Sequence, residues 1–214
     1  MERLEITEQT PPHLIFDSWI KEAAAHPATK DATAMTVATV SPEGEPYARV
    51  VLCKEWSVEG FTFFTNYNST KGRHLAHTPR AAAVFYWEAL FRQVIISGQV
   101  EKVPRQVSVD YWRTRPRESQ ISQCISRQSE TAASRQALEE AWAEAENRFR
   151  GAEVPCPEHW GGYILKPRRM EFWIGRPGRL HDRFEFVRSG ASPSTLPMPS
   201  GPGVPNWTFR RLYP

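Results

Sequence analysis

The chain has 214 residues, of which 40% are hydrophobic and 12% aromatic, which is enough for a substantial buried core and excludes global disorder. Its net charge of +3 arises from 27 basic and 24 acidic residues, so composition predicts no nucleic-acid partner. No stretch approaches the ~18 consecutive apolar residues of a membrane span. The three cysteines, Cys53, Cys124 and Cys156, lack metal-site or redox-pair spacing. We expect a cytoplasmic protein with reduced thiols, no membrane span and no metal.

Arginine dominates the basic residues, with 21 arginines against 6 lysines. The planar guanidinium pairs bidentately with phosphate or carboxylate, so this bias favours a search for small phosphorylated ligands. A GC-rich genome or a role in surface solubility explains it more simply. The common phosphate loops GxxxxGK[ST] and GxGxxG are both missing.

The first half of the chain reads as one helix followed by strands. An apolar face at helical spacing predicts an amphipathic helix over 12–26. Strands are predicted at 34–40 and 46–53 around a turn at 41–44, and at 61–65. A short helix follows residues 68–72 and ends at Pro79, and strand character returns at 81–87 and 92–103. Short connections between these strands predict an antiparallel sheet closed as a barrel.

The second half begins with helices and returns to sheet. A helix is predicted from Pro104 to about Arg115, and a longer one over roughly 131–150. Strands are predicted at 161–167, 169–175 and 179–187, with a last strand within 206–214. The segment 189–205 carries five prolines and three glycines, which predicts a flexible loop. We expect a mainly β, α+β fold in a single domain over 1–214, with helices flanking an antiparallel barrel and an N-terminal helix and arm over 1–28.

Basic and hydroxyl side chains gather at strand ends in the first half. Arg49 and Lys54 lie on one predicted strand at a spacing that places them on opposite faces, so they suit two different anions. Thr65, Ser69 and Lys71 follow at a strand-to-helix junction, where free backbone N–H groups favour an anion. The alternative is that Ser69 caps the helix and Lys71 is solvated.

Two further polar clusters lie in the second half. In the run 111–130, Pro116 would end a helix just after Arg115 and leave Arg115 and Ser119 near an exposed helix end, where they could hold a phosphate. In the run 178–186, strand alternation would place Arg179, His181 and Arg183 on one face. An ordinary solvated face is the alternative explanation for both clusters.

Eight segments taken together resemble the pyridoxine/pyridoxamine 5'-phosphate oxidase family over about residues 16–214. These segments are RVVLCK (49–54), FFTNYNSTKG (63–72), FYWEALFRQV (85–94), YWRTRPRESQ (111–120), SRQS (126–129), WGGY (160–163), EFWIGRPGRLHDR (171–183) and the terminal RRLYP. The combination of RLHDR preceded by EFW with RPRESQ upstream is highly specific. The resemblance implies an FMN-binding split-barrel fold and a homodimer with two flavin sites at the subunit interface.

The resemblance also implies an activity and a set of site residues. The activity is oxidation of pyridoxine or pyridoxamine 5'-phosphate to pyridoxal 5'-phosphate by hydride transfer from C4′ to flavin N5, with O2 as acceptor and H2O2 as by-product. The implied FMN contacts are Arg49, Val50, Val51, Leu52, Phe64, Thr65, Lys71, Gln93, Gln128, Ser129, Trp173 and Arg183, some of them from the opposite subunit. The implied substrate contacts are Lys54, Tyr111, Arg115 and Ser119 at the phosphate, and Arg179 and His181 as catalytic residues over the pyridine ring.

One position departs from the family pattern. Thr70 stands before Lys71 where many members have arginine, which implies weaker FMN binding or compensation by a neighbour such as Arg73. Two rival functions stay open: a phenazine-type flavin oxidase, and a catalytically weak paralogue that only binds FMN or pyridoxal phosphate. The substrate-side set that includes Lys54 and Arg115 favours the oxidase of vitamin B6 phosphates.

Overall fold

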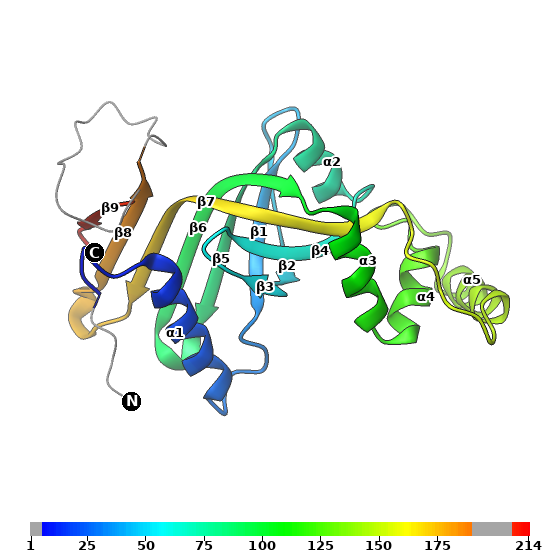
Figure 1. The fold of residues 1–214 in the computed structure, drawn as a ribbon, viewed down its shortest axis with the longest axis horizontal. Helices are drawn as coiled ribbons and strands as arrows, with labels where there is room; N and C mark the ends of the chain where they lie inside the picture. Colours follow the sequence, from blue (N-terminus) through cyan, green and yellow to red (C-terminus); the bar gives the residue numbers. More distant parts are fainter. Residues whose placement is uncertain (1–5, 190–206) are drawn as a thin grey trace.

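The computed structural model of the protein describes residues 6–189 and 207–214 (Figure 1). The helices are α1 (Pro12–Ala25), α2 (Thr70–His77), α3 (Arg105–Thr114), α4 (Arg117–Ile125) and α5 (Arg135–Arg148), with short 3₁₀ turns at Glu88–Leu90 and Pro177–Arg179. The strands are β1 (Ala34–Val40), β2 (Pro46–Leu52), β3 (Glu55–Trp56), β4 (Phe61–Asn66), β5 (Arg80–Trp87), β6 (Arg92–Lys102), β7 (Trp160–Ile174), β8 (Asp182–Arg188) and β9 (Trp207–Arg211).

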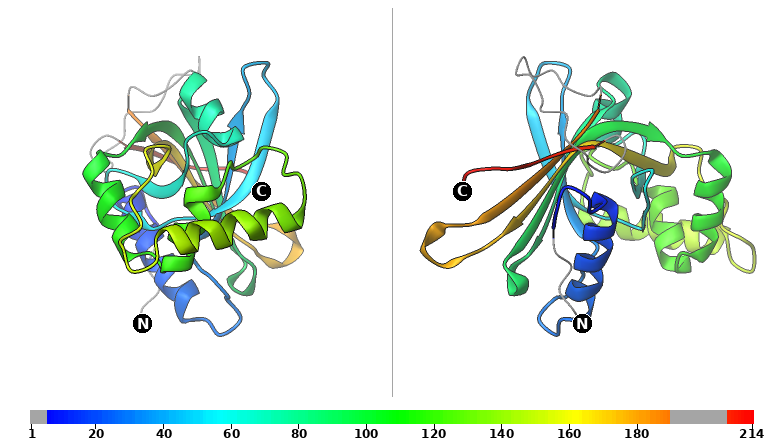
Figure 2. Two further views of the ribbon diagram at one scale, coloured as in Figure 1. Left: turned by 90° about the vertical axis from the view of Figure 1, so that its right-hand side faces the viewer. Right: turned by 60° about the vertical axis from the view of Figure 1, so that its left-hand side comes forward.

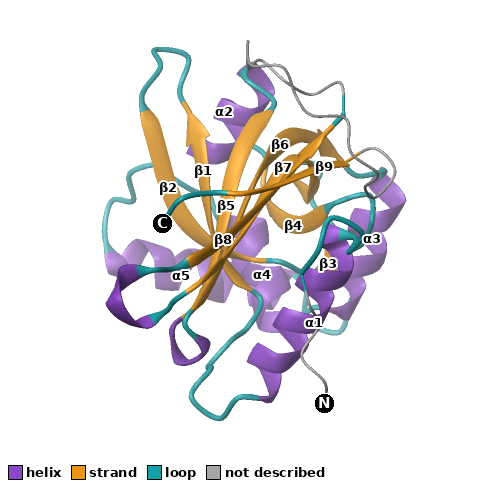
Figure 3. Ribbon diagram, turned by 90° about the vertical axis from the view of Figure 1, so that its left-hand side faces the viewer, coloured by secondary structure: helices purple, strands orange, loops and turns teal. Residues whose placement is uncertain are grey.

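The strands form one antiparallel sheet that curls into a half-barrel (Figure 3). Its main order is β2-β1-β5-β6-β7-β4-β3, with β8 and β9 added beside β7. The long strand β7 pairs with β6 on one side, and on the other side its first half pairs with β4 and its second half with β8. The predicted fold class, a mainly antiparallel split barrel with flanking helices, is confirmed.

Helix α1 covers the sheet because one of its faces is apolar, as its sequence predicted. Ile15, Phe16, Trp19 and Ile20 are each at most 3% exposed and join the main core. The Phe16 ring lies edge-on 4.8 Å from the ring of Phe61 on β4. Two further views show α1 beside the sheet, with the β8–β9 end projecting away from helices α3 to α5 (Figure 2).

Helices α3, α4 and α5 form a second, smaller core at the start of β7. Helix α4 is absent from the sequence prediction. Pro116 ends α3 but also stands at the N-terminal boundary of α4. Only Ile121 of α4 is buried, so the sequence has no apolar stripe from which this helix could be predicted. Helix α5 begins at Arg135, four residues later than predicted, where the Ser134 side chain accepts a hydrogen bond from Ala137 N.

The predicted strands 161–167 and 169–175 are one strand, which corrects the prediction. Strand β7 is continuous for 15 residues, and the break in pattern at Pro167 and Arg168 is a bulge. Gly98 pairs with Pro167 and Ser97 with Arg169, so Arg168 has no partner on β6. Proline is tolerated at such a bulge because it cannot donate a ladder hydrogen bond.

The predicted strand 179–187 also begins later, at Asp182. Gly178 and Arg179 both have left-handed backbone conformations, with φ of 66° and 62°, so the chain turns there and strand alternation does not apply to Arg179 and His181. The last predicted strand is confirmed as β9. The predicted loop at 189–205 lies, from residue 190 on, outside the described residues.

Three other expectations concern the chain as a whole. Cys53, Cys124 and Cys156 are free thiols, as expected. Across residues 6–189 and 207–214, no helix has both the length and the apolar character needed to cross a membrane. The single-domain organisation over 1–214 stays a prediction.

Candidate functional site

A pocket of about 220 Å³ lies between the end of β2, strand β4, the start of α2, helix α3 and the segment after α4. Its lining residues are Val50, Val51, Leu52, Lys54, Phe64, Thr65, Lys71, Tyr111, Arg115, Gln123, Gln128 and Trp160. All of them except Gln123 and Trp160 are predicted site residues. Residues predicted to contact the flavin and residues predicted to contact the substrate therefore line one cavity, although they are widely separated in the chain.

The charge of this pocket is positive and uncompensated. Lys54, Lys71 and Arg115 line it, and no aspartate or glutamate does. Among the ion pairs of the described residues, none involves these three side chains or Arg49. Because partly buried like charges without partners are costly, the arrangement indicates a site for an anionic ligand.

Lys71 carries the most strongly perturbed charge of the pocket. Its side chain is buried, at 7% exposure, and Nζ donates hydrogen bonds to Thr65 Oγ1 at 3.1 Å and Gln128 Oε1 at 2.8 Å. Burial and the positive charge of Arg49 lower the pKa of Lys71 from 10.5 to about 8. The capping role of Ser69 is confirmed, since its hydroxyl accepts from Gly72 N, but the alternative of a solvated Lys71 is wrong.

Aromatic side chains form one wall of the pocket. The ring of Phe64 stacks on Tyr111 at 4.0 Å and on Trp160 at 5.5 Å between centroids. The Arg115 guanidinium lies 4.9 Å from the Trp160 ring, and burial lowers the pKa of Arg115. Its buried Nε has no hydrogen-bond partner among the described residues, so this cation retains a free donor. Helix α3 ends before Arg115, as Pro116 predicted.

The segment after α4 folds across the start of α2. Asn66 Nδ2 donates to Ser126 O at 3.0 Å, and Thr70 N donates to Ser129 Oγ at 3.2 Å. Ser129 has a left-handed φ of 76°, which helps the chain turn back at this point. These contacts place Gln128 and Ser129 beside Lys71 although almost sixty residues separate them in sequence.

Thr70 and its neighbour Arg73 also lie at the start of α2. The Arg73 guanidinium donates to Asn68 O and Thr70 Oγ1, and Arg73 is not among the pocket's lining residues. Compensation for Thr70 by Arg73 therefore stays a prediction.

The structure also gives the positions of three other predicted residues, Lys54, Arg49 and Ser119. Lys54 lies two residues beyond the end of β2, so its position relative to Arg49 does not follow from strand alternation, which corrects the prediction of opposite faces on one strand. Its backbone N donates to Thr62 O of β4 at 2.8 Å, which directs the chain across to the pocket. Arg49 is half-buried beside Lys71, and Ser119 is half-buried in the first turn of α4; neither lines the pocket.

The remaining predicted residues form a second group at the far end of the sheet. Gln93, Trp173 and Arg183 are consecutive partners across β6, β7 and β8. The His181 ring lies 4.8 Å from the Trp173 ring, and its Nδ1 accepts a hydrogen bond from Arg176 N at 3.1 Å. Arg179 is exposed on the preceding turn.

The two groups cannot meet within one chain. Trp160 begins the 15-residue strand β7 and Trp173 is its penultimate residue. At roughly 3.3 Å per residue, about 40 Å of strand separates them. None of Gln93, Trp173, Arg179, His181 and Arg183 lines the pocket.

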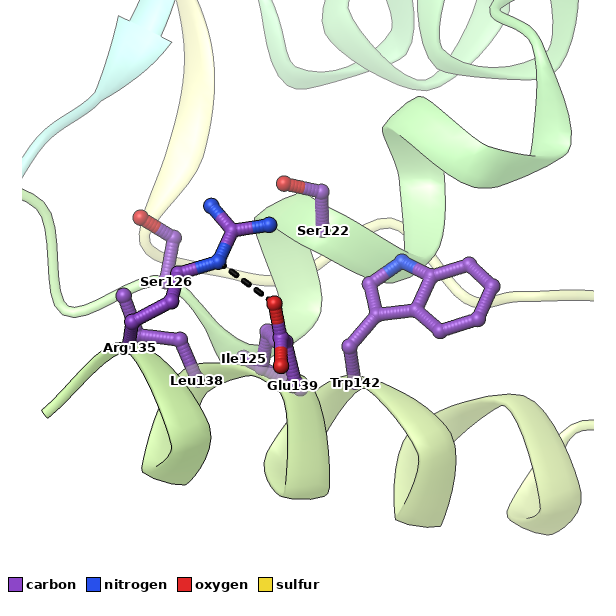
Figure 4. A pocket seen from close by; sticks show the side chains of 7 residues that line it. All are labelled: Ser122, Ile125, Ser126, Arg135, Leu138, Glu139 and Trp142. Atoms are coloured by element: carbon purple, nitrogen blue, oxygen red, sulfur yellow. Dashed lines mark hydrogen bonds and ion pairs between the residues drawn. The ribbon is translucent and has the colours of Figure 1, made fainter.

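A larger cavity of about 540 Å³ lies between α4 and α5 (Figure 4). It is lined by Ser122, Ile125, Ser126, Arg135, Leu138, Glu139 and Trp142. Arg135 and Glu139 form an ion pair of 2.6 Å within it, so its cation is already neutralised. Despite its size it lacks the unpaired positive charge of the smaller pocket, and no residue of the predicted site lines it.

Fold and pocket together define a split-barrel protein with a positively charged cavity at one end of the sheet. Residues 22–149 match the family model described as pyridoxamine 5'-phosphate oxidase, and residues 160–214 match the pyridoxine 5'-phosphate oxidase C-terminal dimerisation region. The chain belongs to the pyridoxine/pyridoxamine 5'-phosphate oxidase family, which is a family of oxidoreductases.

Relatives and solved structures agree with this assignment. The chain is 47% identical over 183 residues, 85% of each sequence, to the pyridoxine/pyridoxamine 5'-phosphate oxidase of Pseudomonas paraeruginosa. It is 42% identical to the pyridoxine-5'-phosphate oxidase of Bos taurus, over 93% of this chain and 77% of the relative. The structure of PhzG from Burkholderia lata, in complex with tetrahydrophenazine-1-carboxylic acid, is similar with a TM-score of 0.85 and 27% identity, covering 100% of this chain and 98% of PhzG. A pyridoxamine 5'-phosphate oxidase-related, FMN binding protein from Nostoc punctiforme shares the fold with a TM-score of 0.70 and 14% identity, over 97% of this chain and 100% of that protein.

Proposed function

We propose that the protein is an FMN-dependent oxidase that converts pyridoxine and pyridoxamine 5'-phosphate to pyridoxal 5'-phosphate, with O2 as acceptor and H2O2 as by-product. The observation that carries this proposal is the pocket lined by Lys54, Lys71 and Arg115 without any carboxylate, in a chain of this family. Cofactor and substrate each carry a phosphate, and two phosphates account for the excess of positive charge.

The residues around Lys71 suit the phosphate of FMN. Arg49 and Lys71 supply two neighbouring charges whose mutual repulsion a phosphate would relieve. Thr65 and the backbone of residues 50–52 border the same space, and Phe64 offers an aromatic face. A dianion would stabilise the charged form of Lys71, since a nearby opposite charge raises the pKa of an amine. Gln128 and Ser129 would complete this side of the cofactor site.

The residues around Arg115 suit the phosphate of the substrate. Lys54, Tyr111 and Arg115 line the same pocket, and the free Nε of Arg115 is available for a phosphate oxygen. Ser119 lies in the first turn of α4, close in sequence to Arg115, and would add a hydroxyl donor. A guanidinium stacked on an indole is also held rigidly, which reduces the entropy lost on binding.

The second group of residues would come from a partner subunit. The strand length that separates it from the pocket argues against a contribution within one chain, and its members other than Gln93 lie in the segment that matches a dimerisation region. We infer a homodimer in which Gln93, Trp173 and Arg183 of one subunit approach the flavin bound to the other. Arg179 and His181 would then lie over the pyridine ring.

The chain's own residues would orient the substrate and manage its protons. FMN, when bound, supplies the hydride acceptor at N5 for the hydrogen on C4′ and returns the electrons to O2. Arg179 would fix the pyridine ring and favour negative charge on its phenolic oxygen. His181 Nδ1 accepts from Arg176 N, so the neutral imidazole carries its proton on Nε2, which is the atom available for proton exchange.

A visible absorption spectrum before and after anaerobic addition of pyridoxamine 5'-phosphate tests the proposal. We expect a flavin band that bleaches with substrate and returns with air, together with release of H2O2. A yellow protein whose band survives the substrate would instead identify a catalytically weak paralogue. A colourless protein that fails to take up added FMN would contradict the proposal.

The likeness to PhzG makes a phenazine-type oxidase the second candidate. Peroxide release with pyridoxine 5'-phosphate, compared with release on a dihydrophenazine precursor, separates the two. The proposal expects turnover of the phosphate ester and a higher KM for it in Arg115→Met, because the guanidinium would hold that phosphate. Turnover of the phenazine precursor alone would favour the second candidate.

A further inference from the structure

A buried polar contact chain links α2 to Arg49 without touching the pocket. Arg49 Nη1 donates to Thr39 Oγ1 at 2.7 Å and to Val37 O at 3.3 Å. Thr39 Oγ1 in turn lies 3.2 Å from His74 Nδ1. Thr39 and His74 are 1% and 6% exposed, so the contact between them is shielded from water.

One of the two hydrogen bonds has a fixed direction. A guanidinium only donates, so Thr39 Oγ1 accepts from Arg49. The Thr39 hydroxyl keeps its single proton for a second partner, and we infer that it donates this proton to an unprotonated His74 Nδ1. Burial, followed by the charges of Arg49 and Arg73, lowers the pKa of His74, which keeps the ring neutral near pH 7, while Glu43 has a weaker opposite effect.

The contacts of Thr39 and His74 can hold Arg49 without neutralising it, which a carboxylate could not do. Arg49 and Lys71 repel one another, so Arg49 needs an anchor that holds it beside Lys71. A carboxylate would anchor it but would neutralise the charge that an incoming phosphate uses. A hydroxyl backed by a neutral imidazole fixes the guanidinium and leaves its charge available.

We propose that Thr39 and His74 are positioning residues that hold Arg49 in place for the phosphate of the flavin cofactor. The inference rests on the proposed function, because FMN is its ligand. His74 lies one turn after Lys71 on α2, so the same helix supplies a direct phosphate ligand and the support of a second ligand. Neither Thr39 nor His74 lines the pocket.

The test compares FMN with riboflavin, which lacks the phosphate, in flavin fluorescence titrations of the flavin-free protein. We expect Thr39→Val and His74→Leu each to weaken FMN binding about tenfold, as for loss of one hydrogen bond to a charged group, and to leave riboflavin binding unchanged. Thr39→Ser and His74→Asn retain a hydroxyl and an acceptor near the Nδ1 position, so they should recover most of the loss. Thr36→Val, on the opposite face of β1, is the matched control and should bind FMN like the wild type.

A second measurement needs no flavin. In ¹⁵N NMR spectra of the flavin-free protein, with His74 assigned by comparison with His74→Asn, the ring should carry its proton on Nε2 and not on Nδ1. A proton on Nδ1 overturns the inferred acceptor role of His74 behind Thr39. This measurement decides the point even if the Thr39 variants do not fold.

The outcomes separate the two proposals. A wild-type protein that binds FMN no more tightly than riboflavin refutes the phosphate site itself, and the inference falls with it. A wild type that prefers FMN, with Thr39→Val keeping that preference in full, refutes the inference alone.

Discussion

Replacing Lys71 with methionine should stabilise the flavin-free protein while destroying its affinity for FMN. Lys71 is 7% exposed, and its charge is repelled by the charge of Arg49. No carboxylate among the described residues forms an ion pair with Lys71. Methionine has a similar length and no charge, so it fills the space without the cost of burying an ammonium group. The site would thus sacrifice stability of the free protein for affinity for an anion.

The size of the effect follows from the pKa of Lys71. A decrease from 10.5 to about 8 corresponds to about 3 kcal/mol by which the folded state disfavours the charged amine. The hydrogen bonds to Thr65 and Gln128 are lost in the variant, which costs about 1 to 2 kcal/mol in total. The net expectation is a gain of about 1 to 2 kcal/mol at pH 7.

The pH dependence of stability independently checks the sign of this change in the free energy of unfolding. Because the pKa of Lys71 is lower in the folded state, the unfolded chain binds more protons between about pH 8 and 10.5, and the wild type gains stability from this group as pH rises across that window. The advantage of Lys71→Met should therefore shrink at pH 9.5. Below pH 8 it should be fully present.

Urea unfolding of flavin-free wild type and variant, at one protein concentration and at pH 7 and 9.5, measures both effects. FMN titration of the same samples should show affinity lost by at least tenfold. A variant less stable than the wild type at pH 7 would refute the argument that the charge of Lys71 is uncompensated. An advantage that does not change with pH would refute its electrostatic origin.

Four further substitutions test other parts of the structure. Arg179→Met should lower kcat/KM at least a hundredfold while FMN stays bound, as judged by the flavin spectrum; near-wild-type turnover would remove this residue from the mechanism. Arg115→Met should raise KM for pyridoxine 5'-phosphate about 10- to 100-fold with FMN affinity unchanged, and an unaltered KM would contradict its assignment to the substrate phosphate. Glu171→Gln should lower the free energy of unfolding by about 1 to 3 kcal/mol, because this carboxylate, 2% exposed, accepts from Arg169 and Arg183, of which Arg183 would lose its ion-pair partner while Arg169 keeps Glu185; the urea midpoint decides. Gly161→Ala should cost at least about 1 kcal/mol in the same assay, since its Cβ would lie 2.1 Å from Tyr67 Oη, and an unchanged midpoint would show that the ring can move aside.

Local patterns in the sequence were sufficient for most elements of the fold. The apolar face over 12–26 and the turn at 41–44 gave α1 and the β1–β2 hairpin with bounds within a residue or so. Local patterns failed to predict an element where its course depends on pairing with residues far away in the sequence. Pro167 looked like the end of a strand, but pairing with β6 carries β7 through it as a bulge.

The site was predictable as far as the family motifs reach. Those motifs named most lining residues of the pocket, although their roles at the flavin and the substrate remain proposals. They gave no indication of Trp160 as a stacking surface for Arg115, or of Thr39 and His74 as the support of Arg49. No periodicity or spacing signals such partners. Trp160 and Arg115, and likewise Thr39 and His74, are more than thirty positions apart in the chain, and Thr39 meets Arg49 only through the pairing of β1 with β2.

The sequence by itself determined the class of fold, the family and the kinds of side chain available for binding phosphate. Tertiary structure alone decided which cations share a cavity, that no carboxylate neutralises them, and that Trp173 and Arg183 lie a strand's length away from it. Local patterns report whether a residue favours a helix, a strand or a turn. The pKa of Lys71 and the separation of Trp173 and Arg183 from the pocket depend on burial and on distances through space, which only the folded chain establishes.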